Sequence, residues 1–283
     1  MNPSVRGPAV AGLFYPAEPE ALARAVDALL SATPASDALP GERPRMLVSP
    51  HAGYTYSGPV AARAFARLHR GTIDAVVIVG PSHVDNFAFT SVYDGDAYAT
   101  PLGIMEVDRE LAARLAGAHA TVRASKRGHV LPVGDRGEHG IEVLLPFLQR
   151  ACAGVRIVPV VMGTQDWDAC HALGRAIADT ADLERTLVVA SSDLSHFHRY
   201  DDAVARDTAF CDTLAGLDAK QMHDAIRSGR CEACGAGPVV ASLIATEVWR
   251  ERRCRVLARI NSGDVTGDRN SVVGYASAIV SAS

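Results

Sequence analysis

Histidines follow short apolar runs at three places in this sequence. The runs cover residues 46–50, 74–79 and 186–190, and they lead to His51, to His83, and to the pair Asp193 and His196. Such runs, rich in β-branched residues, are typical of buried strands. In an open α/β sheet, ligands bind in the crevice beyond the carboxyl ends of the strands. Because imidazole is the commonest metal ligand near neutral pH, the pattern predicts a metal site built by His51 and His83.

A thiol is the candidate third ligand. Cys231 and Cys234 form a Cys-x-x-Cys pair in a loop that precedes a predicted helix beginning at Pro238. The amino terminus of a helix lowers the pKa of a nearby thiol, which favours the thiolate that a metal requires. Three other interpretations stay open: a redox dithiol, half of a zinc clamp, and a buried structural cysteine. Cys234 is therefore a candidate metal ligand beside the two histidines.

Asp193, His196 and His198 are the candidates for proton chemistry. A lone buried carboxylate is costly, so Asp193 is expected to be a metal ligand, a partner that orients a ligand histidine, or a cap for the following segment. His196 suits a general acid or base because the reference pKa of histidine lies near neutrality. His198 is the weakest candidate, since a simple surface position explains it equally well.

Glu138, His139 and Glu142 form a further polar cluster. The sequence predicts a helix that opens at Glu138 and runs to about Ala151, on which the two glutamates share one face by their i, i+4 spacing. Acidic residues in a first helical turn are favourable through the macrodipole alone, which is a sufficient structural explanation. At the start of that helix, the ring of His139 can also point into the crevice.

Strands and helices alternate along most of the chain. Predicted strands cover residues 46–50, 74–79, 87–93, 155–162, 186–190, 254–261 and 271–280, and predicted helices cover residues 19–31, 59–68, 107–116, 138–151, 166–180, 201–216, 218–228 and 238–252. Segments 33–44, 53–58, 94–103 and 119–137 are expected to form loops, turns or a hairpin. This order predicts an α/β fold with a mostly parallel central sheet, helices on both faces and an antiparallel closing pair. Residues 1–283 are interpreted as a single domain.

The composition excludes several classes of protein. The 283 residues carry a formal charge of −4, which provides no basic surface for nucleic acid or anionic lipid. No apolar stretch is long enough to span a membrane, and no secretory signal is evident, so we expect a cytoplasmic protein with six reduced cysteines. The sequence lacks a dinucleotide-binding glycine fingerprint, a phosphate-binding loop and a nucleophile elbow. Nucleotide cofactors and serine hydrolysis therefore lose support.

Motifs along nearly the whole chain resemble the MEMO family. They lie at residues 6–16 (Arg-Gly-Pro-Ala-Val-Ala-Gly-Leu-Phe-Tyr-Pro), 50–54 (Pro-His-Ala-Gly-Tyr), 80–83 (Gly-Pro-Ser-His), 138–142 (Glu-His-Gly-Ile-Glu), 191–196 (Ser-Ser-Asp-Leu-Ser-His), 234–235 (Cys-Gly) and 273–276 (Val-Gly-Tyr-Ala). The structural relatives of this family are the class III extradiol ring-cleavage dioxygenases, the LigB-like group. The resemblance implies an α/β sheet with the site at one edge. It further implies that His51, His83 and Cys234 occupy metal-binding positions, and that Asp193 and His196 line the same pocket.

The third ligand is where this sequence departs from the dioxygenases. Those enzymes hold ferrous iron with two histidines and a glutamate, whereas the matching position here is Cys234. Two histidines and a carboxylate leave open positions for oxygen, while a thiolate is softer and also suits copper(I) or zinc. The resemblance thus implies Fe(II) as the metal, with Cu or Zn as alternatives, and the departure weakens the case for ring cleavage.

Three functions fit these observations. The first is an iron-dependent oxidoreductase, in which His196 moves protons and Asp193 orients it or completes the site. The second is a non-catalytic module on the same fold that binds a peptide, a metal ion or a partner protein, since some relatives are described as adaptors for phosphotyrosine peptides. The third is a zinc hydrolase. The expected ligand is a small organic molecule or a peptide, and the family's link to AMMECR1-like and radical-SAM proteins implies a shared pathway.

Overall fold

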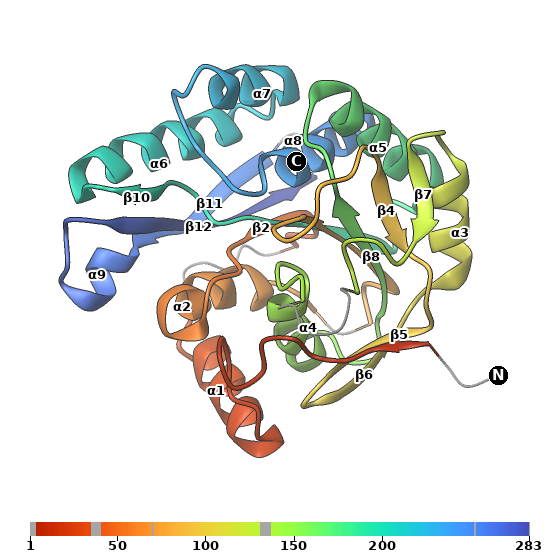
Figure 1. Ribbon diagram of the computed structural model, residues 1–283, viewed down its shortest axis with the longest axis horizontal. Coiled ribbons are helices and arrows are strands. Elements are labelled where there is room, and N and C mark those ends of the chain that lie inside the picture. Colours follow the sequence, from red (N-terminus) through yellow and green to blue (C-terminus); the bar gives the residue numbers. More distant parts are fainter. Residues whose placement is uncertain (1–3, 35–40, 70, 131–136, 252, 283) are drawn as a thin grey trace.

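The chain has a mixed α/β fold, shown in Figure 1. The computed structural model describes residues 4–34, 41–69, 71–130, 137–251 and 253–282. Within these residues a nine-stranded sheet has the order β10-β12-β2-β9-β3-β8-β4-β7, with β11 paired to β12. A separate three-stranded sheet has the order β1-β5-β6. The predicted fold class is therefore confirmed.

Four parallel strands form the centre of the large sheet. They are β2 (Pro44–Ser49), β9 (Thr186–Ser191), β3 (Ala75–Pro81) and β8 (Arg156–Met162). Neighbours are parallel throughout this set, from β2 to β9, from β9 to β3, and from β3 to β8. Every residue of the first three strands is buried, as a parallel sheet covered on both faces requires. The carboxyl ends of the four strands consequently meet at one edge of the sheet.

The flanks of the large sheet are mainly antiparallel, so the sheet is mixed rather than mostly parallel. On one side, β12 (Val272–Ser281) runs antiparallel to β2, and both β11 (Arg253–Asn261) and β10 (His196–His198) run antiparallel to β12. On the other side, β4 (Thr90–Tyr93) is antiparallel to β8, and β7 (Val122–Ser125) is parallel to β4. The sequence did not predict β7 or β10, because each is short and buries at most one residue, which leaves no periodic signal.

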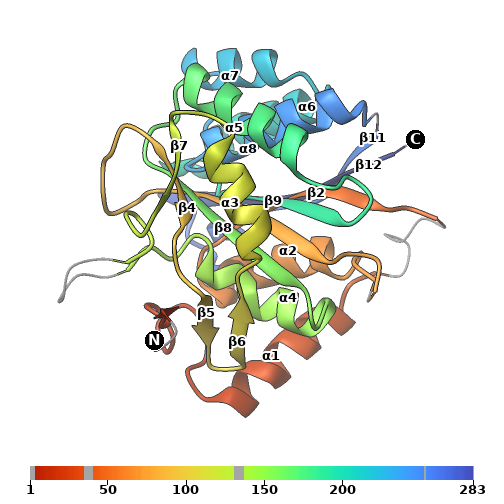
Figure 2. The same cartoon turned by 90° about the vertical axis from the view of Figure 1, so that its right-hand side faces the viewer.

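Helices cover both faces of the large sheet, as predicted, and Figure 2 shows the two layers. One layer contains α5 (Trp167–Thr180), α6 (Tyr200–Ala215), α7 (Ala219–Arg227) and α8 (Ala236–Trp249). The other contains α1 (Pro19–Ser31), α2 (Tyr54–Phe65) and α4 (Leu145–Ala151). α8 packs between the sheet and α5, which explains why its sequence is apolar almost all round.

The remaining elements are short. α3 (Arg109–Gly117) packs on β7 and β4, and α9 (Ser262–Thr266) lies in the connection between β11 and β12. The small sheet consists of β1 (Val5–Arg6) and the hairpin of β5 (Ala97–Thr100) and β6 (Gly103–Glu106). No helix among the described residues has both the length and the apolar character needed to cross a membrane.

Two predicted helix starts are wrong. α2 begins at Tyr54, inside the predicted turn, because the Tyr54 amide donates to the Phe14 carbonyl at 2.8 Å and the Tyr54 ring is buried. The helix predicted to open at Glu138 begins only at Leu145, after a single 3-10 turn at Glu142–Leu144. In both cases contacts distant in sequence decide where the helix begins. Residues 35–40 and 131–136 of the predicted loops lie outside the described residues.

Candidate metal centre

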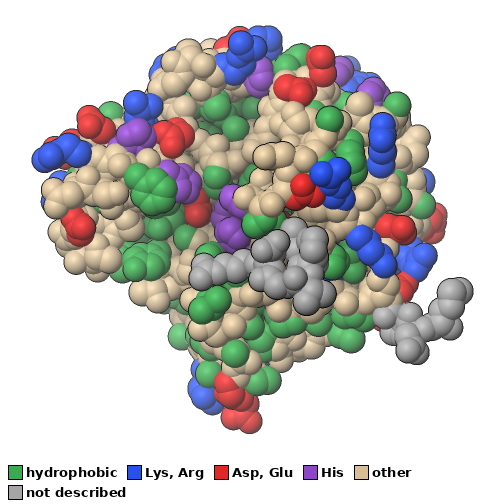
Figure 3. Space-filling view, in the orientation of Figure 1, with side chains coloured by type: hydrophobic (Ala, Val, Ile, Leu, Met, Phe, Trp, Pro, Cys, Tyr) green, Lys and Arg blue, Asp and Glu red, His purple; other side chains and the backbone are tan. Residues whose placement is uncertain are grey.

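The carboxyl ends of the parallel strands bring three predicted ligands together. His51 follows β2, His83 follows β3, and Cys234 lies in the loop before α8. One ligand atom from each lies within 4.8 Å of the others. Figure 3 shows a group of histidine side chains near the middle of this face, with hydrophobic side chains beside it. The expected convergence of these three residues is observed, and their role as metal ligands remains our proposal.

The ring of His51 is fixed with one nitrogen toward the other ligands. Its Nδ1 lies 2.7 Å from the hydroxyl of Ser191, and that hydroxyl donates its proton to the carbonyl of Gly140. The serine oxygen therefore accepts from His51 Nδ1–H, which leaves the lone pair on Nε2. Nε2 lies 3.3 Å from the sulfur of Cys234. Burial lowers the pKa of His51 to about 3, so the ring is neutral, as a metal ligand must be.

Glu138 orients His83 in the same way. One carboxylate oxygen lies 2.8 Å from His83 Nδ1, and the other accepts the His83 amide at 2.6 Å. Burial lowers the pKa of His83, but the hydrogen bond and the charge of Glu138 outweigh it, and the net shift is upward. Burial acts to raise the pKa of Glu138, yet the bonds from His83 and from the Gly140 amide hold it at about 2. Glu138 is thus a carboxylate that leaves Nε2 of His83 for a ligand.

Cys234 is held beside the end of β9 by a tight backbone contact. Its sulfur accepts the amide of Asp193 at 3.3 Å, and its own amide donates to the Asp193 carbonyl at 3.2 Å. A Cβ on Gly235 would lie 2.1 Å from the carbonyl oxygen of Ser191, so only glycine permits this approach. Burial and the charge of Asp193 raise the pKa of the thiol. The expected lowering by the helix terminus is therefore wrong, and metal binding would have to displace the proton.

Asp193 and His196, the predicted proton-transfer residues, lie beside these ligands and have different partners. Asp193 is buried and accepts the amides of His51 and Ala52, at 2.8 and 3.3 Å. Burial raises its pKa, although both bonds act to lower it. His196 donates from Nδ1 to the carbonyl of Leu194 at 2.7 Å, which leaves Nε2 as its basic nitrogen. Asp193 therefore holds the His51 backbone in place and makes no hydrogen bond with the His196 ring among the described contacts.

His139 lies in the centre, whereas Glu142 does not. The His139 ring stacks on that of His83 with 4.6 Å between centroids, and it lies 5.4 Å from the ring of His51. Burial, together with the charges of the two other histidines, lowers its pKa to about 4. Glu142 instead accepts hydrogen bonds from Arg6 and from the Tyr15 hydroxyl. The predicted sharing of one helix face by Glu138 and Glu142 is wrong, because no helix joins them.

Several polar residues that follow the strand ends serve the fold instead. The Tyr54 hydroxyl donates to the carbonyl of Val143 at 2.9 Å, and the Ser57 hydroxyl donates to the carbonyl of Ala52 at 2.7 Å. His198 pairs through Nε2 with Glu232 at 2.7 Å. These groups are occupied by protein partners and do not provide free donors to a ligand.

The sequence reasoning missed three residues that complete the centre. Ser191 fixes the tautomer of His51, and Gln165 donates to the Cys234 carbonyl at 3.0 Å. Gln165 follows β8, so the rule that selected the histidines at strand ends would have found it. Burial, and after it the charge of Asp193, raises the pKa of the buried Tyr275. Tyr275 lies on β12, the strand that pairs with β2.

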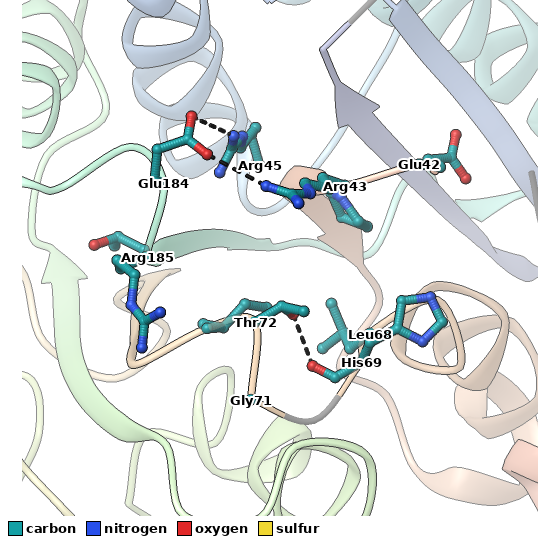
Figure 4. A pocket seen from close by; sticks show the side chains of 12 residues that line it. Glu42, Arg43, Arg45, Leu68, His69, Gly71, Thr72, Glu184 and Arg185 are labelled. Atoms are coloured by element: carbon teal, nitrogen blue, oxygen red, sulfur yellow. Dashed lines mark hydrogen bonds and ion pairs between the residues drawn. The ribbon is translucent and has the colours of Figure 1, made fainter. Parts of the chain in front are cut away.

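A cavity lies at the opposite, amino ends of the same strands (Figure 4). Its volume is about 280 Å³. Arg45 donates to Glu184 at 2.7 Å, and Arg43 lies 3.5 Å from the same carboxylate. None of the predicted site residues lines this cavity.

The centre is arranged so that it could hold a metal ion. Two imidazole nitrogens and a sulfur lie within 4.8 Å of one another, and two of the three side chains are oriented by a second protein group. His83 is the most accessible of the oriented pair, with 26% of its side chain exposed. A ligand can therefore approach the centre from the His83 side. These features define a mixed α/β protein with a cluster of two histidines and a cysteine that could hold a metal ion.

The chain belongs to the Memo family, because the family model described as Memo-like protein matches residues 6–279. A MEMO1 family protein of Methanothermobacter thermautotrophicus is 37% identical over 96% of this chain and 99% of its own length. One of Methanocaldococcus jannaschii is 38% identical over 99% of this chain and its entire length, 100%. The resemblance inferred from the motifs is confirmed.

A solved structure supports the fold independently. The crystal structure of an uncharacterized protein from Escherichia coli K12 matches 84% of this chain and 100% of its own, with a TM-score of 0.55. The two sequences are 16% identical, so the likeness extends to the fold alone.

Proposed function

We propose that this protein binds a metal ion through His51, His83 and Cys234, and that with ferrous iron it acts as an oxidoreductase on a small organic ligand. The observation that carries the proposal is the convergence of three ligand atoms within 4.8 Å. Both imidazoles are held through Nδ1, which keeps Nε2 available. Histidines that bind metals commonly donate their other ring nitrogen to a carboxylate or another protein group, which is the arrangement of both rings here.

The donor set fits a transition metal. Imidazole suits iron, copper and zinc, and a thiolate adds preference for the softer ions, so Cu and Zn are the alternatives to Fe(II). Bound ferrous iron would supply redox chemistry and a Lewis acid.

The remaining residues position groups and move protons. Asp193 holds the backbone at His51, and Glu138 keeps the His83 ring in place. His196 has Nε2 as its basic nitrogen and would exchange a proton with the bound ligand.

The test is metal analysis of protein purified without oxygen or chelators. We expect one metal ion per chain, and its loss in His51→Ala and Cys234→Ser. Oxygen uptake over a panel of catechols and aminophenols then tests turnover. Zinc in place of iron would favour hydrolysis, and full metal content in both variants would refute the centre.

An exposed aromatic side chain favours a second candidate function, a non-catalytic binding module. Phe197, next to His196, is 75% exposed, and Leu13 and Val84, next to Phe14 and His83, are exposed as well. Large apolar side chains beside a polar centre are common where a peptide or a partner protein binds. Capture of a partner by a His51/His83 double variant at the wild-type level would favour this function over catalysis.

A further inference from the structure

The amino-terminal segment, residues 6–15, packs against two stretches of chain that carry residues of the candidate metal centre. It contacts the stretch around Glu138, which lies 132 positions away from Arg6, and also the stretch that follows His51. From these contacts we infer that Arg6 is a positioning residue of the centre. It holds the Glu138 loop where Glu138 can orient His83. The inference rests on the metal function proposed above. It adds a role in that function for residues 6–15, which contain no proposed metal ligand.

Arg6 donates to three acceptors from one guanidinium. Nε donates to the carbonyl of His129 at 3.0 Å, and Nη1 donates to the carboxylate of Glu142 at 2.5 Å. Nη2 donates to the carbonyl of Glu138. The side chain is 4% exposed. Only the planar fork of arginine reaches three acceptors at fixed angles, since lysine provides a single point charge.

Arg6 binds two acidic residues that are close in sequence through different groups: the carboxylate of Glu142 and the backbone carbonyl of Glu138. The buried carboxylate of Glu142 accepts from Arg6, from the Tyr15 hydroxyl and from the amides of residues 9 and 10. The charge of Glu142 is thus balanced within the amino-terminal segment. The carboxylate of Glu138 remains to accept from His83 and from the amides of residues 139 and 140.

A second set of contacts ties the same segment to both sides of the centre. The Phe14 carbonyl accepts the Tyr54 amide at 2.8 Å, and the Phe14 ring meets the His139 ring edge-on at 4.9 Å. A Cβ on Gly137 would lie 2.6 Å from that of Ala9, so the backbone of the Glu138 loop packs directly against the Ala9 side chain. Residues 6–15 therefore hold the His51 and Glu138 stretches in a fixed relation.

The chain offers a matched control for Arg6. Arg45 has a side chain that is 8% exposed, and it donates to the Leu183 carbonyl and to Glu184. It therefore resembles Arg6 in burial and in bonding, but it lies at the amino ends of the strands. Substituting both residues separates a general loss of stability from a specific loss of order at the metal centre.

The experiment compares Arg6→Lys and Arg45→Lys in the full chain. Cobalt(II) titration, read by visible absorption, reports metal affinity, with His51→Ala as the variant without a site. Hydrogen exchange at the amides of His83, His139 and Gly140 in metal-free protein reports the order of the Glu138 loop. We expect Arg6→Lys to lower cobalt affinity by about ten- to hundredfold, as for other partners of metal ligands, and to speed this exchange. Arg45→Lys should change neither.

The inference would be overturned if Arg6→Lys kept the cobalt affinity and the exchange rates of the wild type. It would also be overturned if Arg6→Lys and Arg45→Lys lost cobalt affinity to the same extent. If Arg6→Lys does not fold, Tyr15→Phe is the milder variant and should shift both readouts in the same direction. Wild-type protein that binds no cobalt would overturn the metal function instead. The exchange rates, which need no metal, would then decide the role of Arg6 by themselves.

Discussion

The polar side chains at the two ends of the parallel strands differ in whether they keep an atom available to bind a ligand. At the amino ends, Arg43 and Arg45 share Glu184, so the charged groups pair with one another. At the carboxyl ends, His51 and His83 are each bound through Nδ1 by a protein group. The sulfur of Cys234 faces the other ring nitrogen of His51.

The difference shows how a functional cluster can be told from a structural one. Charged groups that pair among themselves stabilise a surface modestly and have little capacity for a further ligand. Histidines that are oriented by a second group, and keep one lone pair, are arranged as metal ligands are. The chemistry is therefore expected at the carboxyl ends, and the charge pairs at the amino ends are expected to be structural.

Replacing one histidine by alanine at each end of the strands should give the largest difference in metal binding. His83→Ala should abolish stoichiometric metal binding, because it removes a ligand, whereas His69→Ala in the amino-end cavity should leave it intact. Metal content after dialysis against a weak chelator measures both. Retained metal in His83→Ala would show that the ion binds elsewhere.

Neutralising one carboxylate at each end of the strands should give a smaller difference in metal affinity. Glu138→Gln removes the charge that orients His83 and should weaken metal binding by about ten- to hundredfold. Glu184→Gln removes the charge of a largely exposed carboxylate that pairs with Arg45 and should leave metal binding unchanged, at a cost to stability of about 1 kcal/mol or less. Calorimetric titration with zinc compares the two. Equal affinities would mean that Glu138 has only a structural role.

Acid should destabilise the metal-free protein through the histidines on the carboxyl side. Burial lowers the pKa of His51 and His129 to about 3 and that of His139 to about 4. The unfolded chain takes up these protons below an ordinary value of 6.5, so the stabilisation is complete above 6.5 and is lost as the pH falls toward 4. Each histidine contributes up to about 1.4 kcal/mol per pH unit.

Urea denaturation at pH 7.5 and pH 5 measures this effect. His139→Phe should show a smaller loss between the two values than the wild type. Arg45→Lys should show the wild-type loss, because arginine does not titrate in this range. A wild-type stability that rises on acidification would contradict the assignment of neutral histidines. His83 acts in the opposite sense, since its raised pKa favours the folded state until the pH exceeds that value.

Substitutions at residues with left-handed backbone should give the smallest difference, and this difference is in the stability of the fold. Phe197, beside the metal centre, has a φ of 62°, whereas the amino-end cavity uses Gly71 at a φ of 79°. Left-handed backbone costs a residue with a side chain about 1–2 kcal/mol, and asparagine tolerates it better. Phe197→Asn should therefore stabilise the protein by about 1 kcal/mol, and Gly71→Ala should destabilise it by a similar amount. Thermal denaturation measures both, and a destabilised Phe197→Asn would show that the phenyl ring supports the fold.

The sequence alone determined the elements whose signals are local. The strands after which His51 and His83 appear are continuous apolar runs, and a buried parallel strand needs nothing else to be predicted. The helices predicted over residues 107–116 and 166–180 are observed for the same reason, because each begins with a capping bond that lies within one turn, from Asp108 and from Asp166. The topological rule about carboxyl ends then predicts that the histidines lie at one edge of the sheet.

Only the tertiary structure decided which polar groups are partners. Glu138 and Glu142 look equivalent along the chain, but one accepts from His83 and the other from Arg6, because the backbone between them is not helical. The tautomer of His51 depends on Ser191, and the proton on Cys234 depends on burial beside Asp193. These are contacts between residues far apart in sequence, and a one-dimensional pattern holds no information about their distances. The sequence therefore supplied the candidate ligands, and the fold supplied the orientation and protonation on which their chemistry depends.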